Sequence, residues 1–332
     1  MKVNRKGKNL IVLLLTLVMA MGTLLTGCGS SGSGSSGSSS VKIFYTAPPV
    51  DDFKQLLVDA LVANASSEGV TLDVGEGCNS VNEQVQQIED AVNSGYDAII
   101  CLPVDRSTAL QLEVTAGDIP IVYVNSTPDE TYLEKDKFVV VSSYEMDAGT
   151  YQAEYVWNAL GNPKSIDAVL LRGELTHNAA IARSTSITKY YKENGVDINW
   201  VFDDTANWDA TQAQTLMDIF LKTDQSFDAV FCNNDSMAVG VADFLYERGY
   251  DLSKIPVVGV DATASGCQYI AEGKMQFTVY QSASGQGQMA ITAAKQLATK
   301  GSLSDIDGLT EDGLYIWVPF EKVDSSNVKN YM

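Results

Sequence analysis

The chain has 332 residues, of which 45% are hydrophobic and 19% charged, so it is long enough for two lobes that each bury a core. Its formal net charge is -20 at pH 7, and the first 28 residues hold four cations (Lys2, Arg5, Lys6 and Lys8) and no acid, so the remainder is more acidic still. This charge argues against a nucleic-acid partner and against a peripheral protein drawn to anionic lipid.

The N-terminal residues have the features of a bacterial lipoprotein signal peptide, residues 1–28. A basic start precedes an apolar run and then LTGC, which ends at Cys28 and matches a lipobox. The alternative, a transmembrane helix, would need a longer run before the small residues begin. We expect Cys28 to be the lipid attachment site and residues 29–40 to form a flexible tether of on the order of 20 Å. The protein is then anchored outside the cytoplasmic membrane, or is periplasmic.

Nine short apolar runs are predicted to be β-strands, and amphipathic stretches separate them. The runs are residues 41–45, 70–74, 98–102, 121–124, 166–171, 198–202, 227–232, 256–260 and 277–280. Between the second and third runs, Val81, Val85, Ile88 and Val92 recur at helical spacing. Repeated alternation of strand and helix predicts an α/β fold with parallel sheets covered on both faces.

The two halves of the chain resemble each other. DAIIC at residues 97–101 is similar to DAVFC at 228–232, and IPIVYVN at 119–125 is similar to IPVVGVD at 255–261. The sequence therefore predicts two similar lobes, with the first crossing between them at residues 139–149.

Polar and aromatic residues follow the predicted strands, where parallel α/β sheets bind ligands. The internal similarity places Asn125 and Asp261 at corresponding edges. Other strand ends carry Asp51, Asp52, His177, Asn207, Trp208, Asn233, Asn234, Asp235 and Gln281. Each alone has an alternative role as a helix cap, and we interpret Asp235 as the N-cap of the helix that ends at Gly249.

Trp208 lies in a polar loop directly before a predicted helix, and two interpretations of its role remain open. Asp209 is expected to be the N-cap and Gln212 to complete a capping box, so that Trp208 would pack on Ala213 as a hydrophobic staple. Ala213 is a small partner for an indole. The alternative is that Trp208 stacks on a ligand.

The only histidine, His177, lies near Arg183, which shares a helix face with Ala179. No nucleophile or carboxylate is visibly paired with His177 for catalysis. The alternative role of Arg183 is a surface cation paired with Asp261. Planar polar side chains together with aromatic rings are the groups that a sugar requires, because hydroxyls donate and accept hydrogen bonds and C–H faces pack on rings.

Five segments in order resemble the galactose/glucose-binding proteins of ABC importers, within the ribose-binding-like class of sugar receptors. They are LLRGELTHNAAIAR, DDTANWDATQA, AVFCNNDSMAVG, IPVVGVDA and GKMQFTVYQ. The resemblance implies a type I periplasmic binding protein, in which a three-segment hinge joins two Rossmann-like lobes. Residues 41–142 plus 283–317 would form the N-terminal lobe and 143–282 plus 318–332 the C-terminal lobe.

The resemblance also implies a ligand site. Trp208 and Phe53 would stack on the sugar from opposite lobes. The hydroxyl partners would be Asn125, His177, Arg183, Asn234, Asp261, Asp51 or Asp52, and Gln281. Ala179, Ala47 and Gln281 replace Asp, Tyr and Asn of the galactose/glucose pattern, which favours another hexose-like monosaccharide or a bulkier sugar.

We expect no metal and no other cofactor, because the calcium loop of that family has no counterpart at residues 161–166. The four cysteines after Cys28 show no metal-ligand spacing and predict no disulfide framework. The absence of a G-x-S-x-G motif and the single histidine argue against an enzyme.

The sequence therefore predicts a monomeric, lipid-anchored receptor that closes on a sugar and delivers it to an ABC permease with a cytoplasmic ATPase. The alternative is a sensing receptor for a chemoreceptor or histidine kinase, or for a furanosyl signal molecule.

Overall fold

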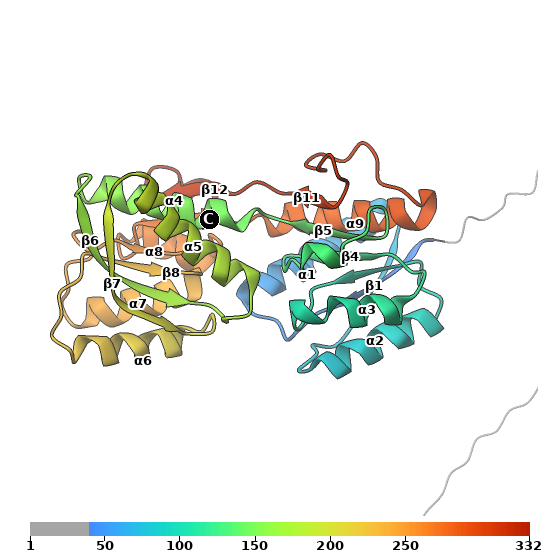
Figure 1. Ribbon diagram of the computed structural model, residues 1–332, viewed down its shortest axis with the longest axis horizontal. Helices are drawn as coiled ribbons and strands as arrows, with labels where there is room; N and C mark the ends of the chain where they lie inside the picture. Colours follow the sequence, from blue (N-terminus) through green and yellow to red (C-terminus); the bar gives the residue numbers. More distant parts are fainter. Residues whose placement is uncertain (1–39) are drawn as a thin grey trace, which may run out of the picture. The chain divides into compact units, whose positions relative to one another are not determined.

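The structure is a computed structural model, and it describes residues 40–332. The predicted signal peptide, Cys28 and all of the predicted tether except Ser40 lie outside the described residues. Residues 40–332 form one compact unit with two six-stranded sheets, each covered by helices on both faces (Figure 1). Within this unit, no helix has both the length and the apolar character needed to cross a membrane.

The first sheet has the strand order β11-β5-β4-β3-β1-β2, and all its neighbouring strands are parallel. Its strands are β1 (Lys42–Thr46), β2 (Thr71–Val74), β3 (Ala98–Cys101), β4 (Ile121–Val124), β5 (Phe138–Ser142) and β11 (Tyr315–Trp317). The helices of this lobe are α1 (Asp52–Glu68), α2 (Val81–Asn93), α3 (Ala109–Ala116) and α9 (Ala283–Lys300), with short 3-10 turns at Arg106–Thr108 and Glu130–Tyr132.

The second sheet has the order β12-β10-β9-β8-β6-β7. Its strands are β6 (Ser165–Arg172), β7 (Asp197–Thr205), β8 (Ala229–Cys232), β9 (Val257–Val258), β10 (Phe277–Tyr280) and β12 (Glu321–Asp324). The helices of this lobe are α4 (Glu145–Ala159), α5 (Asn178–Glu193), α6 (Ala210–Leu221), α7 (Asp235–Glu247) and α8 (Ala264–Ala271), followed by a 3-10 turn at Val328–Asn330.

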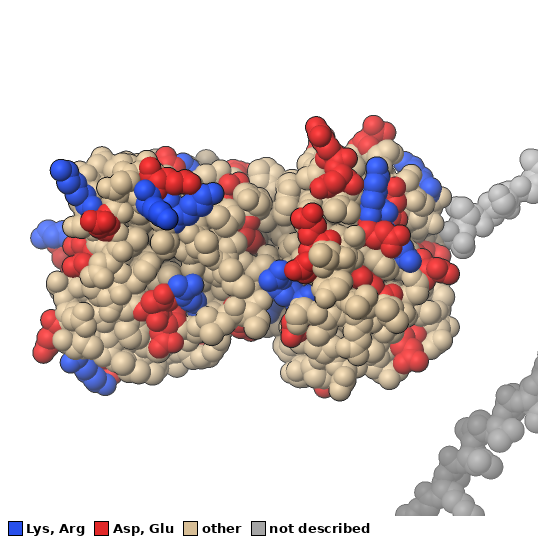
Figure 2. Space-filling model, in the orientation of Figure 1, with Lys and Arg blue, Asp and Glu red and all other residues tan. Residues whose placement is uncertain are grey.

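Each sheet has a hydrophobic core on both faces, as strands buried on two sides require. Along β3, Ala98 and Ile100 belong to the core under α1 and α9, whereas Ile99 and Cys101 belong to the core under α2 and α3. In the second lobe, α6, α7 and α8 cover one face and α4 and α5 the other. On the face of the molecule that Figure 2 shows, Asp and Glu side chains are spread over both lobes.

All nine predicted strands are present, with shifted ends. The largest differences are at the run 198–202, which extends to the nine residues of β7, and at the run 256–260, where β9 has only two residues. Three strands were not among the predicted runs: β5, which overlaps the segment predicted for the first crossing, β11 and β12. Of these, β12 runs antiparallel to β10, so the second sheet is not wholly parallel. Only residues 318–320 separate β11 from β12, and no crossover helix lies between the two strands. The chain therefore enters the second sheet from the edge that faces the first lobe, and β12 runs opposite to the parallel strands of that sheet.

The chain passes between the lobes three times, in short connections after β5, β10 and β11. These connections are residues 143–144, 281–282 and 318–320. The lobe limits at residues 142, 282 and 317 remain a prediction, and each lies within one residue of a connection.

Helices α4 and α5 approach closely at Gly149, directly beside the backbone of Arg183. A Cβ atom on Gly149 would lie 2.0 Å from the Arg183 carbonyl oxygen and 2.2 Å from Ser186 Oγ. The absence of a side chain at Gly149 therefore allows α4 to lie directly against the backbone of α5 at Arg183.

We expect Gly149→Ala to lower the free energy of unfolding by about 1–3 kcal/mol, because α4 and α5 must separate. This sign is opposite to the helix propensities, which favour alanine by about 1 kcal/mol. Urea denaturation measures the effect. Asn158→Ala, an exposed change on the same helix, is the control and should stay within about 0.5 kcal/mol. A stabilised Gly149→Ala variant would contradict the close approach.

Candidate ligand-binding site

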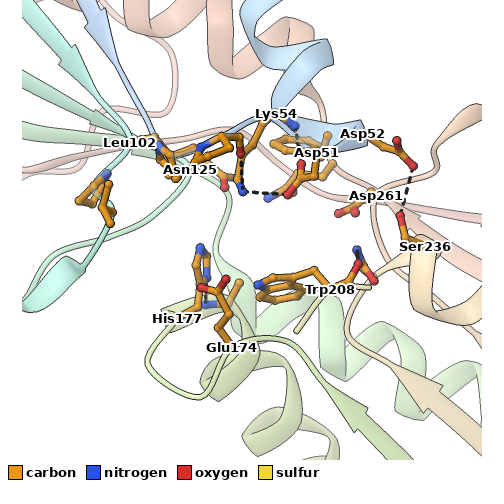
Figure 3. Close-up of a pocket in the computed structure, with 18 of the residues that line it drawn as sticks. Asp51, Asp52, Lys54, Leu102, Asn125, Glu174, His177, Trp208, Ser236 and Asp261 are labelled. Carbon is orange, nitrogen blue, oxygen red and sulfur yellow. Dashed lines mark hydrogen bonds and ion pairs between the residues drawn. The ribbon is translucent and has the colours of Figure 1, made fainter. Parts of the chain in front are cut away.

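A pocket of about 260 Å³ lies at the carboxyl ends of the strands and is lined by both lobes (Figure 3). The structure brings all ten predicted ligand residues to it. The first lobe supplies Asp51, Asp52, Phe53 and Asn125. The second lobe supplies His177, Arg183, Trp208, Asn234, Asp261 and Gln281. The convergence is structural; that these residues bind a ligand remains a prediction.

Arg183 is the most constrained side chain of the site. It is only 3% exposed, so the alternative of a surface cation is wrong. Its Nε donates to Glu145 Oε2 at 2.7 Å, and its Nη1 donates to the Asn233 carbonyl oxygen at 2.6 Å and lies 3.7 Å from Asp261 Oδ1. Burial alone would lower the pKa of Arg183, but the carboxylates of Glu145 and Asp261 raise it above its usual value, so the guanidinium stays charged.

Trp208 forms one wall of the pocket and lies flat against the backbone at Gly173. A Cβ atom on Gly173 would be 2.1 Å from Trp208 Cζ2, so only glycine leaves room for the indole. The His177 ring meets the indole edge-on with a centroid distance of 5.3 Å, and the Arg183 guanidinium lies 6.0 Å from the ring centre. Trp208 itself has a positive φ of 65°, which turns its side chain out of the helix that follows.

The helix start after Trp208 is only partly as predicted. Asp209 is the N-cap and accepts a hydrogen bond from the Gln212 backbone N–H at 2.7 Å. The capping box is wrong, because the Gln212 side chain instead accepts from Asn207 Nδ2 at 2.9 Å. Trp208 packs at the margin of the core that contains Ala213, so it has some staple character as well as a place in the pocket wall.

His177 is the N-cap of α5, and its ring lines the pocket. Its Nδ1 accepts a hydrogen bond from the Ala179 N–H at 3.2 Å, which places the proton of the neutral ring on Nε2. Burial and the neighbouring cations Arg183 and Lys54 lower the pKa of His177 to about 3. The imidazole is therefore a neutral hydrogen-bond donor near pH 7.

Asp261 reaches the pocket from a strained loop after β9. Its φ is 116° and that of Ala262 is 51°, values that non-glycine residues seldom adopt. Asp261 is 7% exposed, and its carboxylate receives no hydrogen bond from any residue in the range 40–332. Burial raises the pKa of Asp261, with Arg183 opposing the rise, so the carboxyl favours its protonated form more than usual.

The loop that carries Asp261 is held by Asp235, whose predicted role as N-cap is wrong. The N-cap of α7 is Asn234, whose side chain accepts from the Met237 N–H at 3.1 Å. Asp235 is the next residue and is fully buried; it accepts from the Thr263 N–H at 2.8 Å and from Thr278 Oγ1 at 2.6 Å. Burial raises the pKa of Asp235 to about 7. Asn234 therefore caps the helix, and the next residue, Asp235, holds the loop that carries Asp261.

The first lobe places two carboxylates at the start of α1. Asp51 is the N-cap, accepts from the Lys54 N–H at 2.9 Å and forms an ion pair with Lys54 Nζ at 2.9 Å. Asp52 accepts a hydrogen bond from Ser236 Oγ of the second lobe at 3.2 Å (Figure 3). Phe53 lies beside them and is shared between the pocket wall and the core.

A second contact between the lobes involves Asn178 at the start of α5. Its Oδ1 accepts from Ser126 Oγ at 3.2 Å and from the Thr127 N–H at 3.1 Å. Together with the bond between Asp52 and Ser236, it joins the lobes through residues that lie at most two positions from a predicted ligand residue.

Sequence reasoning missed several residues of the site. Additional polar lining residues are Lys54, Asn79, Glu174 and Ser236. Glu145, the partner of Arg183, and Gly173 were also not identified. A usable signal existed for Glu145, since a buried arginine needs a carboxylate and Glu145 follows the first crossing directly.

The described residues contain no group of three or more His, Cys, Asp or Glu side chains arranged to hold a metal ion. The four cysteines from Cys78 onward are buried free thiols. Burial raises the pKa of Cys101 and of Cys232, so these thiols act as apolar core groups.

We expect His177→Asn to reduce the loss of stability in acid. The pKa of His177 is about 3 in the folded protein and about 6.5 when unfolded, so the unfolded chain binds the extra proton between these values. The stability that His177 contributes is complete above pH 6.5 and decreases as the pH falls. Asparagine keeps the N-cap without titrating.

Between pH 7 and 5.5, the wild-type unfolding free energy should therefore fall by about 1 kcal/mol more than that of the variant, measured by urea denaturation. No other imidazole is present in the chain to confuse the comparison. Parallel pH profiles would show that His177 titrates normally.

Comparison with known proteins identifies the family. Residues 43–302 match the periplasmic binding protein domain. A protein of Rhizobium meliloti named for rhizopine binding is 33% identical over 287 residues, which cover 85% of this chain and 89% of that protein. The ribose import binding protein of Bacillus subtilis is 25% identical over 245 residues, covering 70% of this chain and 73% of that protein.

The solved structures give the same result. An ABC transporter solute binding protein from Bacillus halodurans, with bound myo-inositol, is 30% identical and has a TM-score of 0.77, covering 90% of this chain and 99% of its own. A Caulobacter myo-inositol binding protein, 21% identical with a TM-score of 0.76, shares the fold and covers 88% of this chain and 96% of its own. The chain therefore belongs to the periplasmic binding protein family, as a solute-binding protein with the type I fold and not an enzyme.

Proposed function

We propose that this protein is the extracytoplasmic receptor of an ABC importer and that it captures a single polyhydroxylated six-membered ring, a hexose or a cyclitol. The observation that carries the proposal is the pocket between the lobes, in which the indole of Trp208 lies beside Arg183 and His177 and the carboxyl of Asp261 lines the same space. An apolar wall beside charged and neutral hydrogen-bonding groups suits a ring with C–H faces and hydroxyl edges.

The pocket supplies both halves of the hydrogen bonds that hydroxyls make. Arg183 and the Nε2 of His177 donate, Asp261 and Asp51 accept, and the amide of Asn125 does both. Hydrogen bonds that involve a charged partner contribute roughly 1.5–3 kcal/mol each. A few of them are enough for tight capture of a small neutral ring.

The size of the pocket favours one ring over an oligosaccharide. Its volume of about 260 Å³ lies below the roughly 300–1,000 Å³ of sites for drug-sized ligands. Ala179 lines the pocket, so the replacement of the Asp of the galactose/glucose pattern by Ala179 supports a difference in the ligand. Ala47 does not line it, so the replacement at that position bears less on the ligand than we expected.

The relatives extend the ligand class beyond aldohexoses. The relative of 33% identity is named for rhizopine binding, and the solved structure of 30% identity holds myo-inositol. The ribose import binding protein is 25% identical. The bound myo-inositol supports a cyclitol, and the resemblance of the sequence to galactose/glucose-binding proteins supports a hexose. We therefore include both in the proposal.

We also propose that the receptor is a monomer attached to the membrane by lipid at Cys28, and that closure of the lobes presents the ligand to an ABC permease with a cytoplasmic ATPase. The anchor rests on the sequence LTGC at residues 25–28, which lies outside the described residues. Delivery to a permease is supported by the family to which the chain belongs.

A ligand panel tests the proposal directly. Residues 40–332, a compact unit by themselves, are heated with myo-inositol, D-glucose, D-galactose, D-allose, D-ribose or maltose. We expect one six-membered ring to raise the melting temperature, since a ligand at 100 times its Kd stabilises by about 2.7 kcal/mol. Stabilisation by none of them would count against a sugar receptor, and by maltose alone against a single ring.

We expect Trp208→Ala to weaken binding of that ligand by about 2 kcal/mol, or roughly 30-fold, measured by calorimetry. Gly173→Ala should also weaken binding, although it leaves Trp208 in place, because its methyl group displaces the indole. Both changes act on the indole of Trp208, so Gly173→Ala should have little further effect on affinity in the Trp208→Ala background. A large loss of ligand-free stability with unchanged affinity would instead identify Trp208 as a helix staple.

A further inference from the structure

Both cations that line the pocket already have carboxylate partners. Lys54 Nζ lies 2.9 Å from Asp51 Oδ2, and Arg183 Nε lies 2.7 Å from Glu145 Oε2. The pocket wall also carries the carboxylates of Asp52, Glu174 and Asp261. An incoming anion would therefore find no cation whose charge is free to receive it.

Glu145 lies behind Arg183 and does not face the ligand. It is 4% exposed and is not part of the pocket wall. Oε2 accepts from Arg183, and Oε1 accepts from Gln281 Nε2 at 3.1 Å, so both of its oxygens are occupied by protein donors. Any effect of Glu145 on a ligand must therefore pass through Arg183 or Gln281.

The same contacts fix the direction of the guanidinium. Nε is directed at Glu145 on α4, and Nη1 at the Asn233 carbonyl oxygen after β8. Nη2 has only a weak contact with Gln281 Oε1 at 3.4 Å, which leaves it free to bind a hydroxyl. Glu145 thus directs Arg183 and compensates its charge through one hydrogen bond.

We propose that Glu145 is a positioning residue that determines the charge specificity of the site: by neutralising Arg183, it makes the pocket accept neutral polyols and reject anionic ones such as uronates and sugar phosphates. This inference rests on the proposed function. It concerns a side chain that the ligand does not touch, so it makes a separate claim from the residues of the pocket wall.

Glu145→Gln tests the proposal, because glutamine keeps the shape and one acceptor oxygen but removes the charge. Calorimetry compares two matched pairs of probes, myo-inositol with myo-inositol 1-phosphate and D-galactose with D-galacturonate. The wild type should bind at least one neutral member and bind its anionic partner at least 100-fold more weakly. In Glu145→Gln the ratio should move at least tenfold toward the anion, since Arg183 then lacks its closest counter-charge.

Two further variants separate this role from a general structural one. Glu154→Gln removes the charge from another glutamate of α4, which pairs with Lys322 away from the pocket, and should leave the ratio unchanged. In an Arg183→Met background, Glu145→Gln should not shift the ratio, because the cation through which it acts is absent. If Glu145→Gln fails to fold, Glu145→Ala, which leaves space for water beside Arg183, should show the same shift.

The outcomes are distinct. A wild type that binds neither myo-inositol nor D-galactose would remove the basis for this assignment, and the wider ligand panel would decide whether the proposed function fails with it. Binding of a neutral ring with the same ratio in a folded Glu145 variant would overturn only the role of Glu145. A shift of equal size in the Arg183→Met background would also overturn it, because the effect would not pass through the guanidinium.

Discussion

A buried guanidinium is costly unless its charge and its donors are satisfied, and this requirement organises the second lobe around Arg183. The partners come from separate parts of the chain: α4, the segment after β8, the loop after β9 and the end of β10. Each segment is thereby held relative to α5. Two of the partners belong to the connections: Glu145 directly follows the connection after β5, and Gln281 lies within the connection after β10. The ligand site and these connections therefore share one hydrogen-bonded network.

Backbone strain is concentrated at the same place. Asn125, Trp208 and Asp261 line the pocket with positive φ values of 64°, 65° and 116°. Such conformations cost of order 1–3 kcal/mol each and persist where surrounding contacts enforce them. For Asp261 the enforcing group is Asp235, which bonds to the neighbouring turn from a fully buried position. These sharp turns direct the three side chains into the pocket, whereas a regular strand end would direct them elsewhere.

The fold was predictable because it rests on local patterns that survive without knowledge of the tertiary structure. Apolar runs separated by helical spacing, and the repeated DA-x-x-C and IP-x-V segments, identify both sheets and both lobes. The strand β11 was missed although it lies in the apolar run LYIWV, because it has only three residues and no predicted helix precedes it, and β12 was missed because its sequence EKVD has a single apolar residue. The antiparallel direction of β12 follows from the path between the lobes. That path is a property of the whole chain.

The pocket residues were predicted largely from resemblance, whereas their supporting contacts were not. Asn234 and Asp235 are neighbours with similar capping ability, and sequence alone could not decide which one caps and which one is buried. Likewise, the pairing of Arg183 with Glu145 joins positions 38 residues apart, and it becomes visible only when α4 and α5 are brought together. Hydrogen-bond partners across elements depend on packing geometry that no local pattern encodes.

The position of Trp208 gives the protein an optical property. The chain has four tryptophans, and Trp208 alone among them lines the pocket. Trp157 and Trp200 pack against the core under α4 and α5, and Trp317 stacks on Tyr315 at the third connection between the lobes. Indole emission depends on local polarity and on nearby charges, so a ring that covers Trp208 changes one emitter directly, and a change in lobe orientation reaches Trp317. The native chain thus carries separate fluorescent reporters for occupancy and for movement of the lobes.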